Sequence, residues 1–144
     1  MRPLRHNAQA MSNNVDPVRS IYTDWERGDF RFTAWADPKI EFVIADGPAR
    51  GNWTEVAQMA TGWRNLLGSW ADCRVVAEEA IRALDDERVL VLNHLSGSAR
   101  SSGVDVGQMR TEGAQLFHVK RGKVTSNVCY ADRDGALADL GLKE

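Results

Sequence analysis

Apolar residues in the first half of the chain recur at every third or fourth position, which is the spacing of one face of a helix. This spacing predicts a helix over residues 16–27, with Asp16 as its N-cap, Pro17 in its first turn and Gly28 at its end. A second, short helix is expected over 29–35.

A third and longer helix is predicted over 52–67. Asn52 and Glu55, three residues apart, resemble a capping box, and Gly68 ends the pattern. The residues of its apolar stripe are Val56, Met59, Ala60, Trp63, Leu66 and Leu67.

The second half of the chain changes to a period of two, which is typical of strands. A short strand over 40–45 precedes the long helix, and a short helix over 132–142 closes the chain. Four consecutive strands lie between these helices, over 72–84, 88–99, 106–119 and 123–131. Helices that are segregated from a run of strands indicate an α+β fold, a curved antiparallel sheet with about three helices on its concave face and a cavity between them.

Composition favours a single globular domain over 15–142, preceded by a flexible tail over 1–14. The chain has 144 residues and a net charge of −2, and its basic residues are interspersed with acids, which argues against nucleic-acid binding. It contains no apolar run of about 18 residues, and its N-terminal segment has no apolar region like that of a signal peptide. Cys73 and Cys129 lie in apolar stretches and are interpreted as buried thiols in a reducing, cytoplasmic compartment.

Four phrases carry a resemblance to a known group of proteins. They are YTDWERGDF (22–30), DGPARGNWTEV (46–56), FHVKRGKV (117–124) and YADRDGALADLGL (130–142). In order and content they resemble the nuclear transport factor 2-like superfamily, and within it the SnoaL-like and ketosteroid-isomerase-related proteins. The resemblance implies a cone-shaped, cystatin-like α+β barrel with a deep pocket, and a homodimer formed through the convex face of the sheet.

The family pattern also implies which side chains face the pocket, because a strand points alternate residues to opposite faces. On strand 88–99 it places Leu90, Leu92, His94 and Ser96 inside and Val91, Asn93 and Leu95 outside. On the last two strands it places Gly113, Gln115, Phe117, Asn127, Cys129 and Ala131 inside. With Tyr22, Trp25, Trp35, Met59 and Trp63 from the helices, an aromatic-lined cavity for a small molecule is expected.

The carboxylates of the family's known reactions are missing from these positions. Phe42 and Val43 lie where a ketosteroid isomerase has its base, Gln115 lies where it has its donor acid, and Cys129 replaces the inward acid of the cyclases. His94 is therefore the candidate proton shuttle. A histidine that only bonds a neighbour is the alternative.

The candidate site thus has a catalytic and a binding part. The catalytic candidates are His94 and Tyr22. The substrate-binding candidates are Gln115, Asn127, Trp25, Trp63, Met59, Leu92, Phe117 and Cys129. For the tryptophans and Cys129, a purely structural place in the core is the alternative.

These residues suggest three functions. The first is a cofactor-free isomerase, cyclase or lyase that acts on a hydrophobic carbonyl compound. The second is a non-catalytic module that binds a small hydrophobic ligand, and the third is a dimeric interaction protein. No HxH, HExxH or GxGxxG spacing occurs, so neither a metal nor a dinucleotide cofactor is expected.

Overall fold

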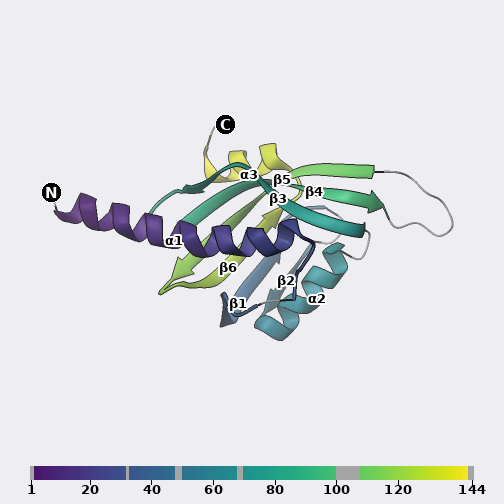
Figure 1. Ribbon diagram of the computed structural model, residues 1–144, viewed down its shortest axis with the longest axis horizontal. Helices are drawn as coiled ribbons and strands as arrows, with labels where there is room; N and C mark the ends of the chain where they lie inside the picture. The colour runs from purple at the N-terminus through teal and green to yellow at the C-terminus, as the bar shows by residue number, and fades with distance from the viewer. Residues whose placement is uncertain (1, 32, 48–49, 68–69, 100–107, 143–144) are drawn as a thin grey trace.

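The computed structural model describes residues 2–31, 33–47, 50–67, 70–99 and 108–142 (Figure 1). Three helices pack with a curved six-stranded sheet in this part of the chain, which confirms the α+β class. The helices are α1 (Arg2–Glu26), α2 (Val56–Leu67) and α3 (Arg133–Leu140). The strands are β1 (Ala36–Ile44), β2 (Gly51–Thr54), β3 (Trp70–Ala83), β4 (Arg88–Ala99), β5 (Gln108–Lys120) and β6 (Lys123–Tyr130).

The sheet has the order β2-β1-β6-β5-β4-β3, and the predicted meander of four long strands forms its larger part. Every neighbouring pair is antiparallel except β1 and β6, which run parallel. The expectation of a wholly antiparallel sheet was therefore wrong at this one pairing. Ile44 lies beside Cys129 in that pairing, which brings the loop after β1 next to the end of β6.

Helix α1 begins at Arg2, so the predicted start at Asp16 was wrong and residues 2–14 are helical. The apolar stripe begins only at Val15, but the preceding residues include several good helix formers, such as Leu4, Ala8, Ala10 and Met11. Pro17 lies inside the helix as a result. The flexibility of residues 1–14 and the domain limits 15–142 stay predictions.

Two other local predictions were wrong. The described residues between 29 and 35 form turns and extended chain, not a helix. The segment that begins at Asn52 is strand β2, and Asn52 pairs with Val43 of β1. The helix that follows begins at Val56, and the side chain of Gln58 in its first turn accepts the backbone N–H of Thr54 at 3.1 Å.

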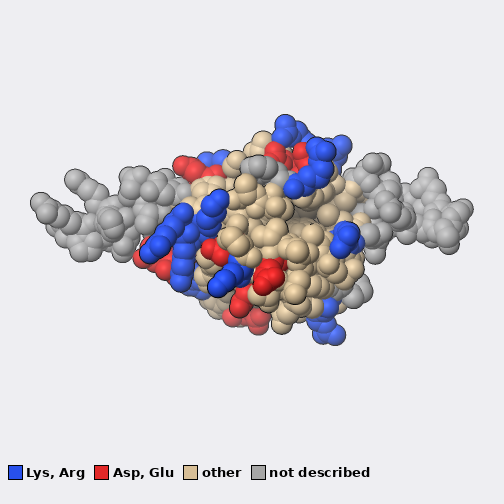
Figure 2. Space-filling view, turned by 90° about the horizontal axis from the view of Figure 1, so that it is seen from below, with Lys and Arg blue, Asp and Glu red and all other residues tan. Residues whose placement is uncertain are grey.

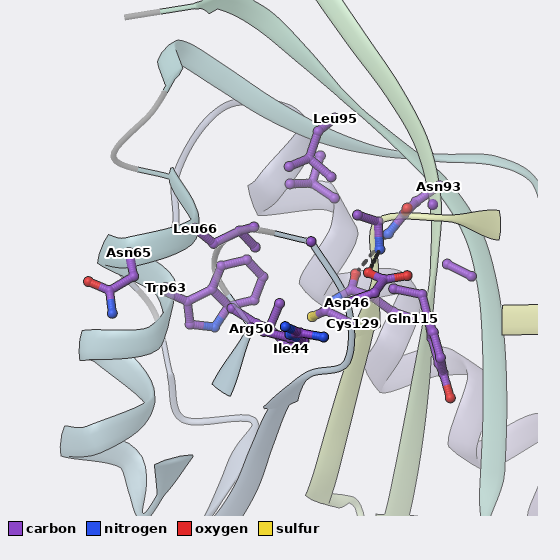
Figure 3. Close-up of a pocket in the computed structure, with 16 residues that line it drawn as sticks. Ile44, Asp46, Arg50, Trp63, Asn65, Leu66, Asn93, Leu95, Gln115 and Cys129 are labelled. Atoms are coloured by element: carbon purple, nitrogen blue, oxygen red, sulfur yellow. Dashed lines mark hydrogen bonds between the residues drawn. The ribbon is translucent and has the colours of Figure 1, made fainter. Parts of the chain in front are cut away.

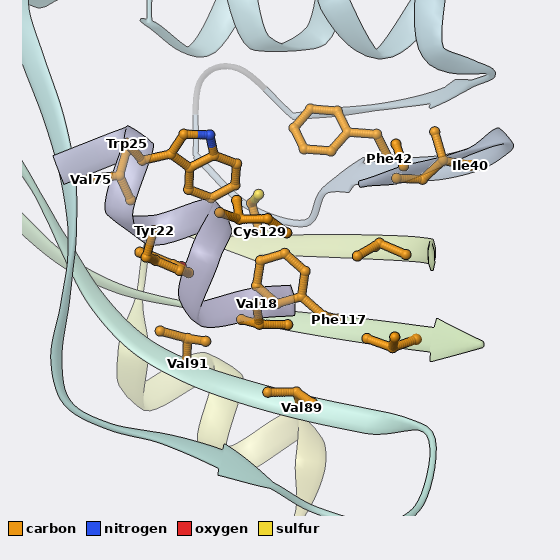
Figure 4. Packing of buried hydrophobic residues seen from close by; sticks show 14 of the residues in the cluster. Val18, Tyr22, Trp25, Ile40, Phe42, Val75, Val89, Val91, Phe117 and Cys129 are labelled. Carbon is orange, nitrogen blue, oxygen red and sulfur yellow. The ribbon is translucent and has the colours of Figure 1, made fainter. Parts of the chain in front are cut away.

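The inner face of the sheet carries the main core. Val18, Tyr22 and Trp25 of α1 pack there against Phe117 of β5, and all four are at most 2% exposed (Figure 4). Burial of each such side chain contributes about 1.5–3 kcal/mol to the stability. The residues that join this core from the strands and α2 include Ile40, Phe42, Met59, Val75, Val89, Val91, Val119 and Val124.

Helix α3 covers the outer face of the sheet. Its Ala136 and Leu137 form a second apolar cluster with Leu90 and Ala114. The expectation that all helices lie on the concave face was therefore wrong for α3. Both faces of β4 are consequently apolar in this part of the strand. The apolar pattern therefore does not show which of the later residues of β4 point inward.

The surface carries charges of both signs. Figure 2 shows basic and acidic side chains interspersed around a broad area of uncharged residues on the face that it displays. None of the helices in the described ranges is long and apolar enough to span a membrane.

Candidate functional site

A cavity of about 460 Å³ lies between the inner face of the sheet and α2 (Figure 3). Trp63, Asn65 and Leu66 form the α2 side, and Leu95 lies on the β4 side. The other lining residues are Ile44, Asp46, Gly47, Arg50, Val75, Asn93, Gly113, Ala114, Gln115, Cys129, Tyr130 and Ala131. The walls are thus mostly apolar, with polar groups at two places, which is the usual composition of a small-molecule site.

The first polar place is a buried network that we call the floor, formed by Tyr22, Asn93, Gln115, Asn127 and Cys129. Gln115 is its centre: its Oε1 accepts hydrogen bonds from the Tyr22 hydroxyl and from Asn93 Nδ2, the latter at 3.0 Å. Its Nε2 donates to Asn127 Oδ1 at 3.3 Å and to Cys129 Sγ at 3.1 Å. Asn93 Nδ2 also donates to the Tyr22 hydroxyl at 2.9 Å. Four separate elements are joined by this one network.

The donor hydrogens of the floor can be counted. Asn93 and Gln115 each have two side-chain N–H groups, and Tyr22 has one O–H. All of these find acceptors within the network. Among the described residues, two buried side-chain atoms have no hydrogen-bond partner, Asn93 Oδ1 and Asn127 Nδ2, and the first of these belongs to a residue that lines the cavity. The floor therefore has no free side-chain donor to offer a ligand from Tyr22, Asn93 or Gln115.

Burial also keeps the ionisable groups of the floor protonated. It raises the pKa of Tyr22 well above its usual value and the pKa of Cys129 to about 12. The nearby carboxylate of Asp46 raises the pKa of the thiol further, against the effect of the hydrogen bond from Gln115. Cys129 is consequently a neutral thiol near pH 7 and a poor nucleophile.

The second polar place is the rim, formed by the half-buried Asp46 and the exposed Arg50 and Asn65. Asp46 follows β1 in the loop that reaches the end of β6. Its carboxylate accepts the backbone N–H of Ala131 at 2.5 Å and that of Asp132 at 3.2 Å. These two bonds hold a carboxylate at the cavity.

Arg133 of α3 holds the floor from the opposite side of the sheet. Its Nη2 donates to the backbone oxygen of Asn93 at 2.7 Å and its Nε to that of Gly113 at 3.2 Å. Asn93 and Gly113 pair directly across β4 and β5. The C-terminal helix therefore fixes the strand pair from which the Asn93 side chain reaches the cavity.

The predicted orientation of β4 was wrong by one residue. Asn93 and Leu95 line the cavity, whereas His94 is absent from its lining and points to the outer face with Leu92. The physical reason is that α3 buries the outer face: Val89 and Leu90 are both almost fully buried, so the apolar pattern of the strand does not distinguish its two sides.

The other predicted site residues fall into two groups. Gln115, Trp63 and Cys129 line the cavity. The remaining inward residues are packed beneath or beside it and do not line it: Tyr22, Trp25, Met59, Phe117 and Asn127. The tryptophan and phenylalanine of this second group contact each other in an aromatic cluster, which places them in the core.

Four polar lining residues were missed by sequence analysis: Asn93, Asp46, Arg50 and Asn65. Asn93 was assigned to the wrong face. Asp46 and Arg50 lie in the phrase DGPARGNWTEV, which was used only as part of the family resemblance. The available signal was an acidic residue just after a buried strand, at the sheet end where the loops gather.

A search of the described residues finds no group of three or more His, Cys, Asp or Glu side chains that could hold a metal ion. Among the described residues, the acidic residue that lines the cavity is Asp46.

Comparison with solved structures identifies the fold. A proposed polyketide cyclase from Xanthomonas campestris pv. campestris superimposes with a TM-score of 0.67 at 18% identity, over 90% of this chain and 97% of that one. An NTF2-like protein of unknown function from Burkholderia pseudomallei gives 0.68 at 19% identity, over 88% and 95%. This is the nuclear transport factor 2-like fold. The resemblance seen in the sequence is thereby confirmed at the level of fold.

A third similar structure is TerC, which was co-crystallised with polyporic acid. It superimposes with a TM-score of 0.67 at 16% identity, over 89% of this chain and 97% of that one. No protein-family model matches the sequence, and no curated protein matches it. At these identities the likeness concerns the fold, so the function has to be argued from the cavity itself.

Proposed function

We propose that this protein binds a small, largely apolar carbonyl compound in the cavity, and that Asp46 is the general base of a cofactor-free isomerase, cyclase or lyase. The observation that carries the proposal is the position of the Asp46 carboxylate, at the cavity and oriented by the backbone N–H groups of Ala131 and Asp132. Apolar walls from Ile44, Leu66 and Leu95 suit a hydrophobic substrate.

The proposed step is proton transfer. The Asp46 carboxylate removes a proton from a carbon next to the substrate carbonyl, and the electrons of the broken C–H bond move onto the carbonyl oxygen as an enolate. Return of the proton from Asp46 to a different carbon gives an isomer, whereas attack of the enolate carbon on a second carbonyl closes a ring. General-base catalysis of this kind contributes roughly 10²–10⁴-fold to a rate.

The reaction is tested in two stages. A thermal-shift screen against aromatic polyketides, steroids and terpenoids first finds compounds that bind, and product formation from each is then followed. In Asp46→Asn we expect kcat to fall by roughly 10²-fold or more, with binding retained. Asp134→Asn, an exposed carboxylate on α3, is the matched control and should keep the wild-type rate. Full turnover by Asp46→Asn would refute the role of this residue.

A non-catalytic binding module is the second candidate, and the floor favours it. The side-chain donors of Tyr22, Asn93 and Gln115 are used internally, and the phenol and thiol stay protonated, so these groups neither stabilise an oxyanion nor attack a substrate. This candidate predicts that a ligand quenches the fluorescence of Trp63 and is recovered unchanged after prolonged incubation.

A homodimer through the outer face of the sheet and a cytoplasmic location are also proposed. The dimer rests on the family resemblance. Leu92 and His94, which point to that face, are partly exposed in the single chain, although α3 already covers Leu90. Light scattering tests it, because the mass in solution would be twice 16.0 kDa, and a mass of 16.0 kDa would overturn it.

A further inference from the structure

We propose that Arg50 binds a negatively charged oxygen of the ligand, so that the cavity selects apolar compounds that carry a carboxylate or an enolate. The inference rests on the proposed function, because it names the chemical class of the ligand in the same cavity. In this proposal, the charged oxygen of the ligand is bound at the rim and not at the buried floor.

The first step is that the floor cannot make this contact. A ligand anion needs N–H or O–H donors, and the side-chain donors of Tyr22, Asn93 and Gln115 are all directed at one another or at Asn127 and Cys129. Asn93 lines the cavity, and its atom without a partner, Oδ1, is an acceptor that would repel an anion. An anionic group placed against Asn93 and Gln115 would therefore find no free amide donor on them, which is strongly unfavourable for a buried charge.

The second step is that the guanidinium N–H groups of Arg50 are available to a ligand. Its guanidinium forms no hydrogen bond or ion pair with any of the described residues, whereas Arg27, Arg31 and Arg88 each pair with a nearby aspartate. Asp46, the other charged residue of the rim, has its carboxylate on the backbone N–H groups of the chain after β6 and not on Arg50. Arg50 is thus an available cation beside a cavity with mostly apolar walls.

The third step concerns geometry and strength. A guanidinium can bind both oxygens of a carboxylate at once, and such charge-assisted bonds are stronger than neutral ones. Exposed ion pairs are weak because water screens them. Here a ligand that fills the cavity excludes water from one side of the pair, where Trp63 and Leu66 also line the space, so the attraction is less screened than on an open surface.

The test uses two probes with the same apolar body, 2-naphthoate and its uncharged methyl ester. Binding to the full chain is measured by titration calorimetry at pH 7.5 and low salt, and repeated with added NaCl. We expect 2-naphthoate to bind roughly tenfold more tightly than the ester, and the preference to weaken with salt. In Arg50→Gln the preference should disappear while the affinity for the ester stays unchanged.

Two further variants make the result specific. Arg50→Lys keeps the charge but not the paired N–H groups, so it should retain part of the preference. Arg64→Gln removes an exposed arginine of α2 that bonds Thr61 and does not line the cavity, so it should retain all of it. Equal binding of the two probes to the wild type, or an undiminished preference in Arg50→Gln, would overturn the inference alone. Failure of both probes to bind would overturn the proposed function and this inference with it.

Discussion

The floor and the rim of the cavity are both polar, but they differ in what their polar groups are doing. On the floor, Gln115 is buried and all of its side-chain hydrogen bonds go to neighbouring residues of the floor. At the rim, Asp46 and Arg50 are partly or fully exposed, and the Arg50 guanidinium has no partner among the described residues. The comparison teaches that burial alone does not identify a catalytic group: the more buried set holds the fold together, and the more exposed set is available for chemistry.

The largest effect is expected from breaking the floor at its centre. Gln115→Ala removes a hydrogen-bond partner of Tyr22, Asn93, Asn127 and Cys129 at once, and leaves the bond from Asn93 Nδ2 to the Tyr22 hydroxyl in place. We expect the free energy of unfolding to fall by about 3–5 kcal/mol, measured by urea denaturation. Asn65→Ala at the rim is the matched control, and its change should stay within about 0.5 kcal/mol. Similar losses in the two variants would contradict the distinction between floor and rim.

The second-largest effect is expected at alkaline pH, where Cys129 of the floor should lower the stability of the fold. Burial raises the pKa of Cys129 from 9.0 to about 12, so above pH 9 the unfolded chain loses this proton while the folded chain keeps it. The unfolded state then binds fewer protons, and stability falls as pH rises from about 9 towards 12. At pH 10.5 the loss from this thiol is about 2 kcal/mol. The raised pKa of Tyr22 acts in the same direction.

Urea denaturation at pH 7.5, 9.0 and 10.5 measures this effect. Cys129→Ala should show a shallower decline than the wild type, whatever its stability at pH 7.5. Cys73, which is less enclosed and has a pKa of about 11, provides a second thiol for comparison through Cys73→Ala. An equal decline in the wild type and in Cys129→Ala would show that the thiol of the floor is not the source.

A smaller effect is expected at the carboxylate of the rim. Asp46→Ala removes the acceptor of the backbone N–H groups of Ala131 and Asp132, but water can reach this site and replace part of what is lost. The free energy of unfolding should fall by about 1 kcal/mol in the urea assay. A loss of stability as large as that of Gln115→Ala would show that the main role of Asp46 is to stabilise the fold.

The smallest effect on stability belongs to Arg50. Because its side chain is exposed and pairs with no described residue, Arg50→Gln should change the free energy of unfolding by no more than about 0.5 kcal/mol. A larger loss would mean that the residue stabilises the loop after β1 and is not reserved for a ligand.

The sequence predicted most of the element order of the fold and part of the site. The family pattern placed Gln115 and Cys129 inside, and both line the cavity. The run Val89–Leu92 is apolar at every position, since α1 and the sheet core cover one side and α3 the other. No pattern in β4 could therefore decide between Asn93 and His94, and the orientation taken from the family was off by one.

The residues of the rim could not be predicted from the sequence, for a different reason. Asp46 and Arg50 lie in a loop, where no periodicity indicates the direction of a side chain. Their place at the cavity depends on the parallel pairing of β1 with β6, which joins distant parts of the chain. Local patterns predict such pairings poorly, because a parallel neighbour can be any strand that follows at a distance.

That same pairing has a consequence for the order in which the molecule is assembled. The antiparallel neighbours β3 to β6 are close in sequence and can pair early, whereas Phe42 of β1 has to meet Asn127 of β6. Contacts of such long sequence separation slow folding. Of the described strands, β1 is the first to be synthesised and β6 is the last. We therefore expect the binding site to be completed only after β6 has been synthesised, with the edge of β1 that faces β6 unpaired until then.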